Sequence, residues 1–329
     1  MDSTIISIGS INADFQMRTS DNEHSETSRA ERFCRLSAGK AANRAYLARR
    51  LKHDARLIGM VGDDDLAEQA LGSLREHGVD LSAVMRAPGC PTAVSIIMVP
   101  SGGKKRIVLA PNANECWRPE QIGAAIRALE AAPPDSLLTM DCEIAAHVSA
   151  ALLDAAVKRR LRIVLDTAPP EYSGKDEIRR LWPHIVACSP NEEEAAALTG
   201  MRVGGRHDAM RAARKLHESG FELACVKLGD GGCAAFSNEG PRIVKVPAIK
   251  PEDTTGAGDA FTGALAVALG ENLRFDDALR FATASANVAV TRWGSQESYG
   301  TREEIDSLAA SLTVEVPDAW DRRKRGRSW

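Results

Sequence analysis

The sequence predicts an α/β fold built on one mostly parallel sheet that helices cover on both faces. Short β-branched or aliphatic runs alternate with longer segments rich in Ala, Leu and Arg, a pattern typical of βαβ units. The chain has 329 residues, of which 44% are hydrophobic, enough for a large core. Polar and Gly-rich motifs follow the expected strands, where ligands bind in open α/β sheets.

The alternating runs give the expected elements in order. Strands are expected at 5–8, 55–60, 137–140, 163–166, 185–187 and 224–227. Helices are expected at 41–51, 66–77, 119–131, 144–159, 192–198, 207–219, 259–269 and 275–292.

Two segments interrupt this alternation, a polar stretch at about 13–36 and an alternating stretch at about 92–110. A hairpin signal, Pro100-Ser-Gly-Gly, divides the second stretch. Together they look like a small β-lid inserted into a single domain over 1–329; the alternative is a surface hairpin without a gating role. The basic tail at 321–329 is expected to be a solvated end.

Composition excludes several functional classes. The net charge is only −3, so nothing points to nucleic acid or an anionic membrane surface, and no apolar run of 18 residues predicts a membrane span. Seven scattered cysteines, without a CxxC pair, predict free thiols and a cytoplasmic protein. The N-terminus reads as a first strand and not as a signal peptide.

The segment 253–263, DTTGAGDAFTG, carries the chemistry. A small turn, Gly256, Ala257 and Gly258, precedes Asp259 and an apolar, helix-like run. The main-chain N–H groups at a helix start have no helical partner and can bind an anion. A carboxylate beside them suits a base acting on a hydroxyl that attacks a phosphoryl group. The alternative is an ordinary helix start, where Gly permits the turn and Asp complements the dipole.

This segment resembles the signature of the PfkB, or ribokinase-like, family of sugar and nucleoside kinases. The resemblance runs from residue 5 to about residue 305. It implies a three-layer α/β/α sandwich with a β-lid, Asp259 as the catalytic base, and a phosphoryl group held by the amides of Gly256, Ala257 and Gly258.

Two further motifs resemble the sugar-binding strand and loop of that family. Asn12 and Asp14 are two apart, so in an extended segment they point the same way, although Asn-x-Asp is also common turn chemistry. The loop AGKAAN follows, with Gly39, Lys40 and Asn43 as candidate sugar ligands. It departs from the family pattern at Ala38, also a substrate-site candidate, and at Ala41, which puts the identity of the sugar in doubt.

Glu143 is a further candidate for binding a sugar hydroxyl. It follows an expected strand in Asp141-Cys-Glu. Asp141 and Glu143 take the places of the Gln and the Glu in a sugar-binding Gln-x-Glu motif that the segment resembles in the family.

The nucleotide side is expected to contain ATP and Mg²⁺. Asn191 and Glu194 lie three apart in a first helical turn, where they either cap the helix or hold the water shell of Mg²⁺; both roles together are favoured. The Gly-rich run from Lys227, with Gly229 and Gly232, resembles the ATP loop of the family. By the same resemblance, Gly258 contacts the nucleotide and Thr283 lines the adenine pocket.

The resemblance also implies a K⁺ loop and a lid-mediated homodimer. The candidate K⁺ ligands are mostly main-chain carbonyls, at Asp253, Thr255, Ala289, Arg292, Gly294 and Ser298. The alternative for this segment is a plain loop end with Arg292 paired to an acid.

The function expected from these motifs is ATP-dependent phosphorylation of a primary hydroxyl on a small sugar, with ribose first. Fructose, 2-keto-3-deoxygluconate or a nucleoside are alternatives within the class. A catalytically silent sugar- or nucleotide-binding regulator is a second class, but both the base and the anion hole are present. A dinucleotide-binding protein is disfavoured because no GxGxxG follows the first strand.

Overall fold

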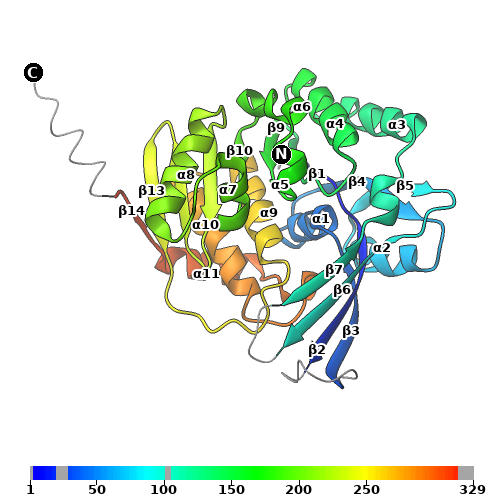
Figure 1. Ribbon diagram of the computed structural model, residues 1–329, viewed down its shortest axis with the longest axis horizontal. Helices are drawn as coiled ribbons and strands as arrows, with labels where there is room; N and C mark the ends of the chain where they lie inside the picture. Colours follow the sequence, from blue (N-terminus) through cyan, green and yellow to red (C-terminus); the bar gives the residue numbers. More distant parts are fainter. Residues whose placement is uncertain (1–2, 20–28, 101–104, 318–329) are drawn as a thin grey trace, which may run out of the picture.

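The computed structural model describes residues 3–19, 29–100 and 105–317, and in this part of the chain a ten-stranded sheet forms the centre (Figure 1). Its order is β14-β13-β12-β11-β10-β9-β8-β1-β4-β5. The strands are β1 (Ile5–Ile8), β4 (Ala55–Gly62), β5 (Asp80–Ala87), β8 (Leu137–Met140), β9 (Arg162–Leu165), β10 (Ala187–Cys188), β11 (Leu223–Lys227), β12 (Cys233–Ser237), β13 (Gly240–Lys245) and β14 (Thr313–Glu315).

Strand β1 lies within the parallel part of this sheet. Ile5 pairs with Ala55 of β4 on one side and with Leu137 of β8 on the other, both in parallel register. All four residues of β1 are buried, as expected for a strand covered on both faces. From β11 to β14 the strands are antiparallel. The mostly parallel sheet expected from the sequence is confirmed.

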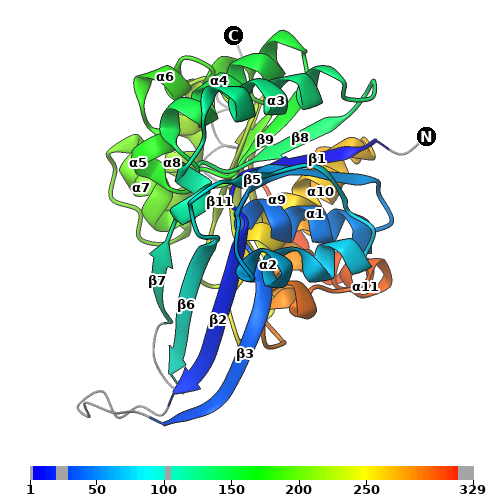
Figure 2. The same ribbon diagram turned by 90° about the vertical axis from the view of Figure 1, so that its right-hand side faces the viewer.

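Helices cover both faces of the sheet and form two separate cores (Figure 2). One face packs against α1 (Lys40–Arg50), α2 (Leu66–Glu76), α9 (Ala257–Gly270), α10 (Phe275–Ala289) and α11 (Arg302–Ser311). The other packs against α3 (Pro119–Glu130), α4 (Ala146–Lys158), α6 (Asp176–Arg179), α7 (Glu192–Thr199) and α8 (Arg206–Glu218), with α5 (Pro170–Ser173) nearby. None of the helices in the described ranges is long and apolar enough to cross a bilayer.

A separate four-stranded sheet, the lid, extends from this body (Figure 2). Its order is β3-β2-β6-β7, and β2 pairs in parallel with β6.

 Asn12 faces Ala93 in this pairing, although the two residues are far apart in the sequence. The lid strands are β2 (Asn12–Thr19), β3 (Ala30–Ala38), β6 (Ala93–Pro100) and β7 (Arg106–Ala110).

The two segments that interrupt the helix–strand alternation therefore form one lid, as expected. The polar stretch at about 13–36 supplies β2 and β3, and the stretch at about 92–110 supplies β6 and β7. The hairpin signal at 101–103 and the basic tail at 321–329 lie outside the described residues.

Most expected elements lie within one or two residues of their predicted bounds, with clear exceptions. Helix α10 ends at Ala289, three residues before its predicted end, and β10 has only two residues, Ala187 and Cys188. Strands β5, β12, β13 and β14 and helices α5, α6 and α11 were not among the expected elements. Their short or partly exposed sequences give weak periodicity.

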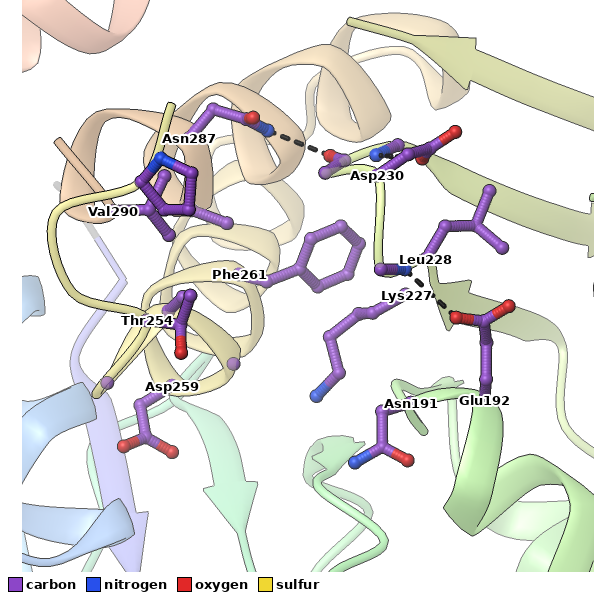
Figure 3. Close-up of a pocket in the computed structure, with 18 of the residues that line it drawn as sticks. Asn191, Glu192, Lys227, Leu228, Asp230, Thr254, Asp259, Phe261, Asn287 and Val290 are labelled. Carbon is purple, nitrogen blue, oxygen red and sulfur yellow. Dashed lines mark hydrogen bonds between the residues drawn. The ribbon is translucent and has the colours of Figure 1, made fainter. Parts of the chain in front are cut away.

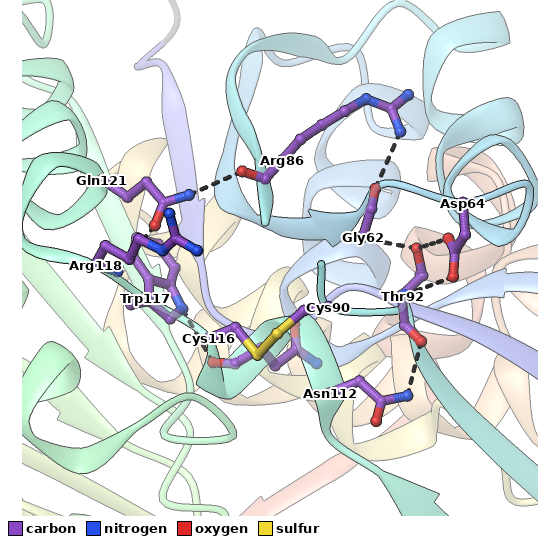
Figure 4. The surroundings of a disulfide bond; sticks show 11 residues. Gly62, Asp64, Arg86, Cys90, Thr92, Asn112, Cys116, Trp117, Arg118 and Gln121 are labelled. Atoms are coloured by element: carbon purple, nitrogen blue, oxygen red, sulfur yellow. Dashed lines mark hydrogen bonds between the residues drawn. A yellow bond between two sulfur atoms is a disulfide. The ribbon is translucent and has the colours of Figure 1, made fainter. Parts of the chain in front are cut away.

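Cys90 and Cys116 form a disulfide bond at the base of the lid (Figure 4). The expectation that all seven cysteines are free thiols is therefore wrong for this pair. The two residues are 26 positions apart, and the chain between them forms β6 and β7, whose antiparallel return brings its ends together. Sequence spacing alone does not reveal such a pairing. The other five cysteines are free: Cys34, Cys142, Cys188, Cys225 and Cys233.

Candidate functional site

A cavity of about 770 Å³ lies at the N-terminal end of α9 (Figure 3). Several parts of the chain line it: Lys40 at the start of α1, Lys105 of the lid, the start of α7, the loop that follows β11, the segment 248–254, the first turns of α9 and the end of α10. Segments far apart in sequence thus meet at one place, as expected for ligand sites in open α/β sheets.

The first turn of α9 begins with a glycine that no other residue can replace without strain. Gly256 is the N-cap and has a φ of 73°, and a Cβ there would come 2.9 Å from Tyr299 Oη. No side chain caps the helix, and the Ala257 N–H makes only a long bond, 3.5 Å, to Thr254 O. The first amides of α9, including that of Gly258, are therefore available to an anion.

Asp259 lies in this first turn, and one of its two carboxylate oxygens accepts no hydrogen bond. Its Oδ2 accepts a hydrogen bond of 2.7 Å from Asn43 Nδ2, and Asn43 is itself held by Gln296. Its Oδ1 is buried without a hydrogen bond and lies 3.9 Å from Lys40 Nζ. A fixed carboxylate with one free oxygen beside an anion hole can accept a proton from a bound hydroxyl.

The predicted acceptor residues gather next to Asp259. Lys40 Nζ lies 3.7 Å from Glu143 Oε1, and Ser10 Oγ donates to Glu143 Oε2 at 2.9 Å while accepting from the Lys40 N–H. Asn12 donates to Ser95 and accepts from Asn114. Hydrogen bonds thus set the orientation of these polar side chains.

The AGKAAN motif has small residues because the main chain between β3 and α1 passes close to the end of the first strand. Ala38 ends β3 and pairs with Asn12 of β2. Gly39 has a φ of 101°, and a Cβ there would come 2.5 Å from Ser10 O. Gly39 is therefore required for close approach to the first strand's end.

Two carboxyl groups at the acceptor end hold protons more tightly than usual. Burial raises the pKa of Asp14 to about 7, with Glu143 and Asp259 adding to the effect and a hydrogen bond from Ser95 opposing it. Burial also raises the pKa of Glu143 to about 7, against the opposing effect of Lys40. Burial alone would lower the pKa of Lys40, but the carboxylates of Glu143, Asp166 and Asp259 outweigh it and raise that pKa well above its usual value.

A buried network of charged side chains supports the acceptor end, and no sequence motif predicted it. Arg44 is fully buried; it lies 2.6 Å from Asp141 Oδ2 and 3.7 Å from Asp166 Oδ2. Asp141 in turn accepts hydrogen bonds from the N–H groups of Ser10 and Glu143. Arg44 therefore acts through Asp141 on two residues of the acceptor end. No periodic or motif signal marked it, because Arg in a helix is usually exposed.

The loop after β11 lines the opposite part of the cavity with main chain (Figure 3). Glu192 braces it by accepting from the Gly229 N–H at 3.0 Å. Gly231 has a φ of 87°, and its carbonyl accepts from Asn287 Nδ2 at 2.8 Å. A Cβ on Gly232 would come 2.7 Å from Val244 O. The predicted Gly-rich loop thus has a tight conformation that needs its glycines.

Asn191 and Glu194 form the capping box of α7. Asn191 accepts from the Glu194 N–H at 2.8 Å, and Glu194 accepts from the Asn191 N–H at 3.0 Å. The capping role is confirmed. No cluster of three or more His, Cys, Asp and Glu side chains suited to a metal occurs in the part of the chain described. The pair fits Mg²⁺ as outer ligands, because this ion usually keeps several waters.

Lys227 and Thr283 take different places relative to the cavity. Lys227 lines it, and a Cβ on Gly258 would come 3.4 Å from Lys227 Nζ, so this ammonium faces the start of α9. Thr283 is 1% exposed and is not among the lining residues. Asn287, one turn later on α10, lines the cavity in its place. The sequence did not predict Asn287, because the resemblance points to Thr283, one helical turn earlier on α10.

Comparison with known proteins decides the family. The model of the pfkB family carbohydrate kinases matches residues 2–302. The chain belongs to this family. A ribokinase of Haemophilus influenzae is 31% identical over 305 residues, covering 92% of this chain and 97% of the relative. A deoxyribokinase of Salmonella typhi is 29% identical, covering 85% and 90%.

Solved structures agree with this PfkB assignment. A ribokinase of Arabidopsis thaliana complexed with ribose and ATP has a TM-score of 0.77 and 28% identity, covering 94% of this chain and 98% of that chain. A ribokinase of Thermotoga maritima has a TM-score of 0.78 and 28% identity, covering 94% and 100%. The ribokinase-like fold and the carbohydrate kinase activity expected from the sequence are therefore confirmed.

The cation loop expected from PfkB resemblance is buried and tightly hydrogen-bonded. Asp253 Oδ1 accepts from the N–H and Oγ1 of Thr255, and its Oδ2 accepts from Gln16 and from the Gly294 N–H. These four bonds match the lone-pair sites of a carboxylate. Ser298 Oγ donates to Ser295 O. Both carboxylate oxygens of Asp253 therefore already accept hydrogen bonds, and neither is free for a cation unless one of these bonds breaks.

Arg292 and Ala289 contribute no side-chain ligand to this loop. The Arg292 guanidinium pairs with Glu304, as the alternative interpretation expects, and Ala289 ends α10.

Trp293 joins this loop to the lid. Its side chain packs with Ile97 and Val99 of β6, and the guanidinium groups of Arg18 and Arg32 lie 4.5 and 5.0 Å from the centre of its ring. This contact attaches the lid sheet to the loop after α10, and the Gln16–Asp253 hydrogen bond attaches it to the segment that precedes α9.

Proposed function

We propose that this PfkB kinase transfers the γ-phosphoryl group of ATP to a primary hydroxyl of ribose. The observation that carries the proposal is the Oδ1 of Asp259, which accepts no hydrogen bond and lies at the open N-terminus of α9 in a cavity that reaches the Gly-rich loop. Relatives named as ribokinases, one of them complexed with ribose and ATP, support both substrates.

In the proposed reaction, Asn12, Asp14, Lys40, Asn43 and Glu143 hold the sugar. Asp259 accepts the proton of the hydroxyl as its oxygen attacks the γ-phosphorus, and the bond from that phosphorus to the leaving diphosphate oxygen breaks. The first amides of α9 stabilise the negative charge on the phosphoryl oxygens.

The nucleotide and its ions occupy the other part of the cavity. ATP lies along the loop 227–232, and Asn191 and Glu194 hold Mg²⁺ through its waters, where the ion neutralises phosphate charge. K⁺ is proposed at the loop before α9, held by main-chain carbonyls of Thr255, Ala289, Arg292 and Gly294 with Ser298 Oγ.

We propose a homodimer that forms through the lid. The lid carries a group of exposed apolar side chains on a small sheet: Phe33, Ile96, Ile107, Val108 and Leu109. Apolar surface of this kind is typical of protein–protein contacts. Light scattering should give a dimer mass for the wild type and a monomer mass for Val108→Lys.

We also propose a cytoplasmic location, which supplies ATP. In that compartment Cys90 and Cys116 would be kept as thiols. Alkylation of the protein in intact cells, followed by mass spectrometry, measures the fraction of each form.

The test is release of ADP from MgATP with ribose, deoxyribose, fructose, 2-keto-3-deoxygluconate and adenosine, each with K⁺ or tetramethylammonium. The strongest rate with ribose, absent in Asp259→Asn, supports the proposal. A stronger rate with another acceptor keeps the kinase assignment and replaces ribose. No ADP above the Asp259→Asn background with any acceptor contradicts both.

A further inference from the structure

Lys105 reaches the active-site cavity from the lid. It directly precedes β7 and lines the same cavity as Lys40, Asp259 and the first turn of α9. The sequence analysis assigned it no role, because it lies in a run of basic residues beside a hairpin turn, where an exposed lysine is expected.

The surroundings of Lys105 contain charges but no direct partner. Burial lowers its pKa and the Lys40 ammonium adds to this, whereas Asp253, Asp259 and Asp14 act in the opposite direction. Among the described residues, no hydrogen bond or ion pair within 4.0 Å joins Lys105 to any of these carboxylates. Lys40, by contrast, pairs with both Glu143 and Asp259.

A partly buried ammonium without a partner is costly, and an anion bound beside it removes that cost. The charges that act on Lys105 come from both the acceptor end (Asp14 and Lys40) and the start of α9 (Asp253 and Asp259). Lys105 also lines the cavity together with Lys40, Asp259 and the first turn of α9, which is where the proposed reaction passes the phosphoryl group from donor to acceptor.

We propose that Lys105 binds the phosphoryl group during its transfer, so that the lid supplies one of the charges that stabilise it. This inference rests on the proposed function. The ammonium acts as a point charge and keeps its proton; the hydroxyl proton goes to Asp259, and the phosphorus–oxygen bond to the leaving diphosphate breaks as the new one forms. Lys227 acts on the same group from the opposite part of the cavity.

The first readout needs no acceptor. Titration calorimetry measures the affinity of two nucleotides, each as its magnesium complex: ADP and the non-hydrolysable analogue adenylyl imidodiphosphate. The wild type, Lys105→Gln and Arg106→Gln are compared. Arg106 is the adjacent, exposed residue at the start of β7 and serves as the matched control. Lys105→Gln should weaken binding of the triphosphate analogue about tenfold and leave the affinity for ADP unchanged. Arg106→Gln should change neither.

The second readout is the rate with the best acceptor of the panel. Lys105→Gln should lower kcat roughly 10- to 100-fold and leave the KM for the acceptor unchanged. A selective loss in either readout supports the proposal. If Lys105→Gln and Arg106→Gln have the same nucleotide affinities and the same kcat, the proposal is overturned. It is also overturned if Lys105→Gln weakens the binding of ADP as much as the binding of the analogue. Failure of the wild type to bind either nucleotide instead contradicts the proposed function.

Discussion

The acceptor end and the nucleotide end of the proposed site are built by different means. The acceptor end consists of buried, charged side chains, among them Asp14, Lys40 and Glu143, with strongly shifted pKa values, and of these three Lys40 lines the cavity. The nucleotide end consists mainly of glycine-rich main chain braced by Glu192 and Asn287. The acceptor end would therefore select its ligand by charge, at a cost in the free energy of unfolding. The nucleotide end would select its ligand by the shape of the main chain.

Asp259 lies where the two ends meet, so its removal should have the largest effect. Asp259→Asn keeps the size of the side chain but cannot accept the hydroxyl proton. We expect kcat to fall roughly 10²- to 10⁴-fold, with nucleotide and sugar binding retained. Steady-state kinetics and calorimetry measure both. A kcat near that of the wild type would exclude Asp259 as the base.

The charged end should be sensitive to loss of its buried support. Arg44→Met leaves Asp141 and Asp166 without their buried cation, and we expect a loss of about 3–5 kcal/mol in the free energy of unfolding. Arg49→Met on the same helix breaks an ion pair with Asp54, which is 81% exposed, and should cost less than about 1 kcal/mol. Urea unfolding compares them. Equal losses would contradict a special role for the network.

The acceptor end should also make stability depend on pH. Asp14 in the folded protein keeps its proton up to about pH 7, whereas in the unfolded chain it ionises near pH 4. The unfolded state therefore binds fewer protons between these values, and stability falls as pH rises from about 4 to 7 and stays low above.

Asp14→Asn removes this ionisation. Between pH 4 and pH 8, we expect the free energy of unfolding of the variant to rise by about 1–3 kcal/mol relative to that of the wild type. Asp54→Asn, at an exposed position, is the control and should follow the wild type. The same pH dependence in Asp14→Asn and wild type would show that Asp14 does not cause it.

The nucleotide end should respond to a change of shape without a change of charge. Gly231→Ala would put a Cβ 2.5 Å from Asn287 Oδ1 at a φ of 87°. We expect the KM for ATP to rise about tenfold, with the KM for the sugar unchanged. Gly229→Ala, with its nearest atom at 3.3 Å on the flexible Glu192 side chain, should have a smaller effect. A larger effect of Gly229→Ala would argue against a shape-selective loop.

Local patterns predicted the parallel sheet, the lid segments and the start of α9, because alternation and turn residues act over short stretches. The motif around Asp259 is also local, and its resemblance to PfkB kinases named most of the site. The Cys90–Cys116 bond, the Arg44 network and Lys105 could not be predicted in this way. Each depends on contacts between segments that only the folded sheet and lid bring together.

The contact of Trp293 with Arg18, Arg32 and β6 has a consequence for how such kinases diverge. The lid and the loop after α10 share one aromatic side chain, so they are not interchangeable modules. A lid grafted from a relative with another acceptor would lose this anchor unless residues 293 and 16 changed with it. New acceptor specificity on this scaffold therefore requires paired substitutions on both sides of the cavity.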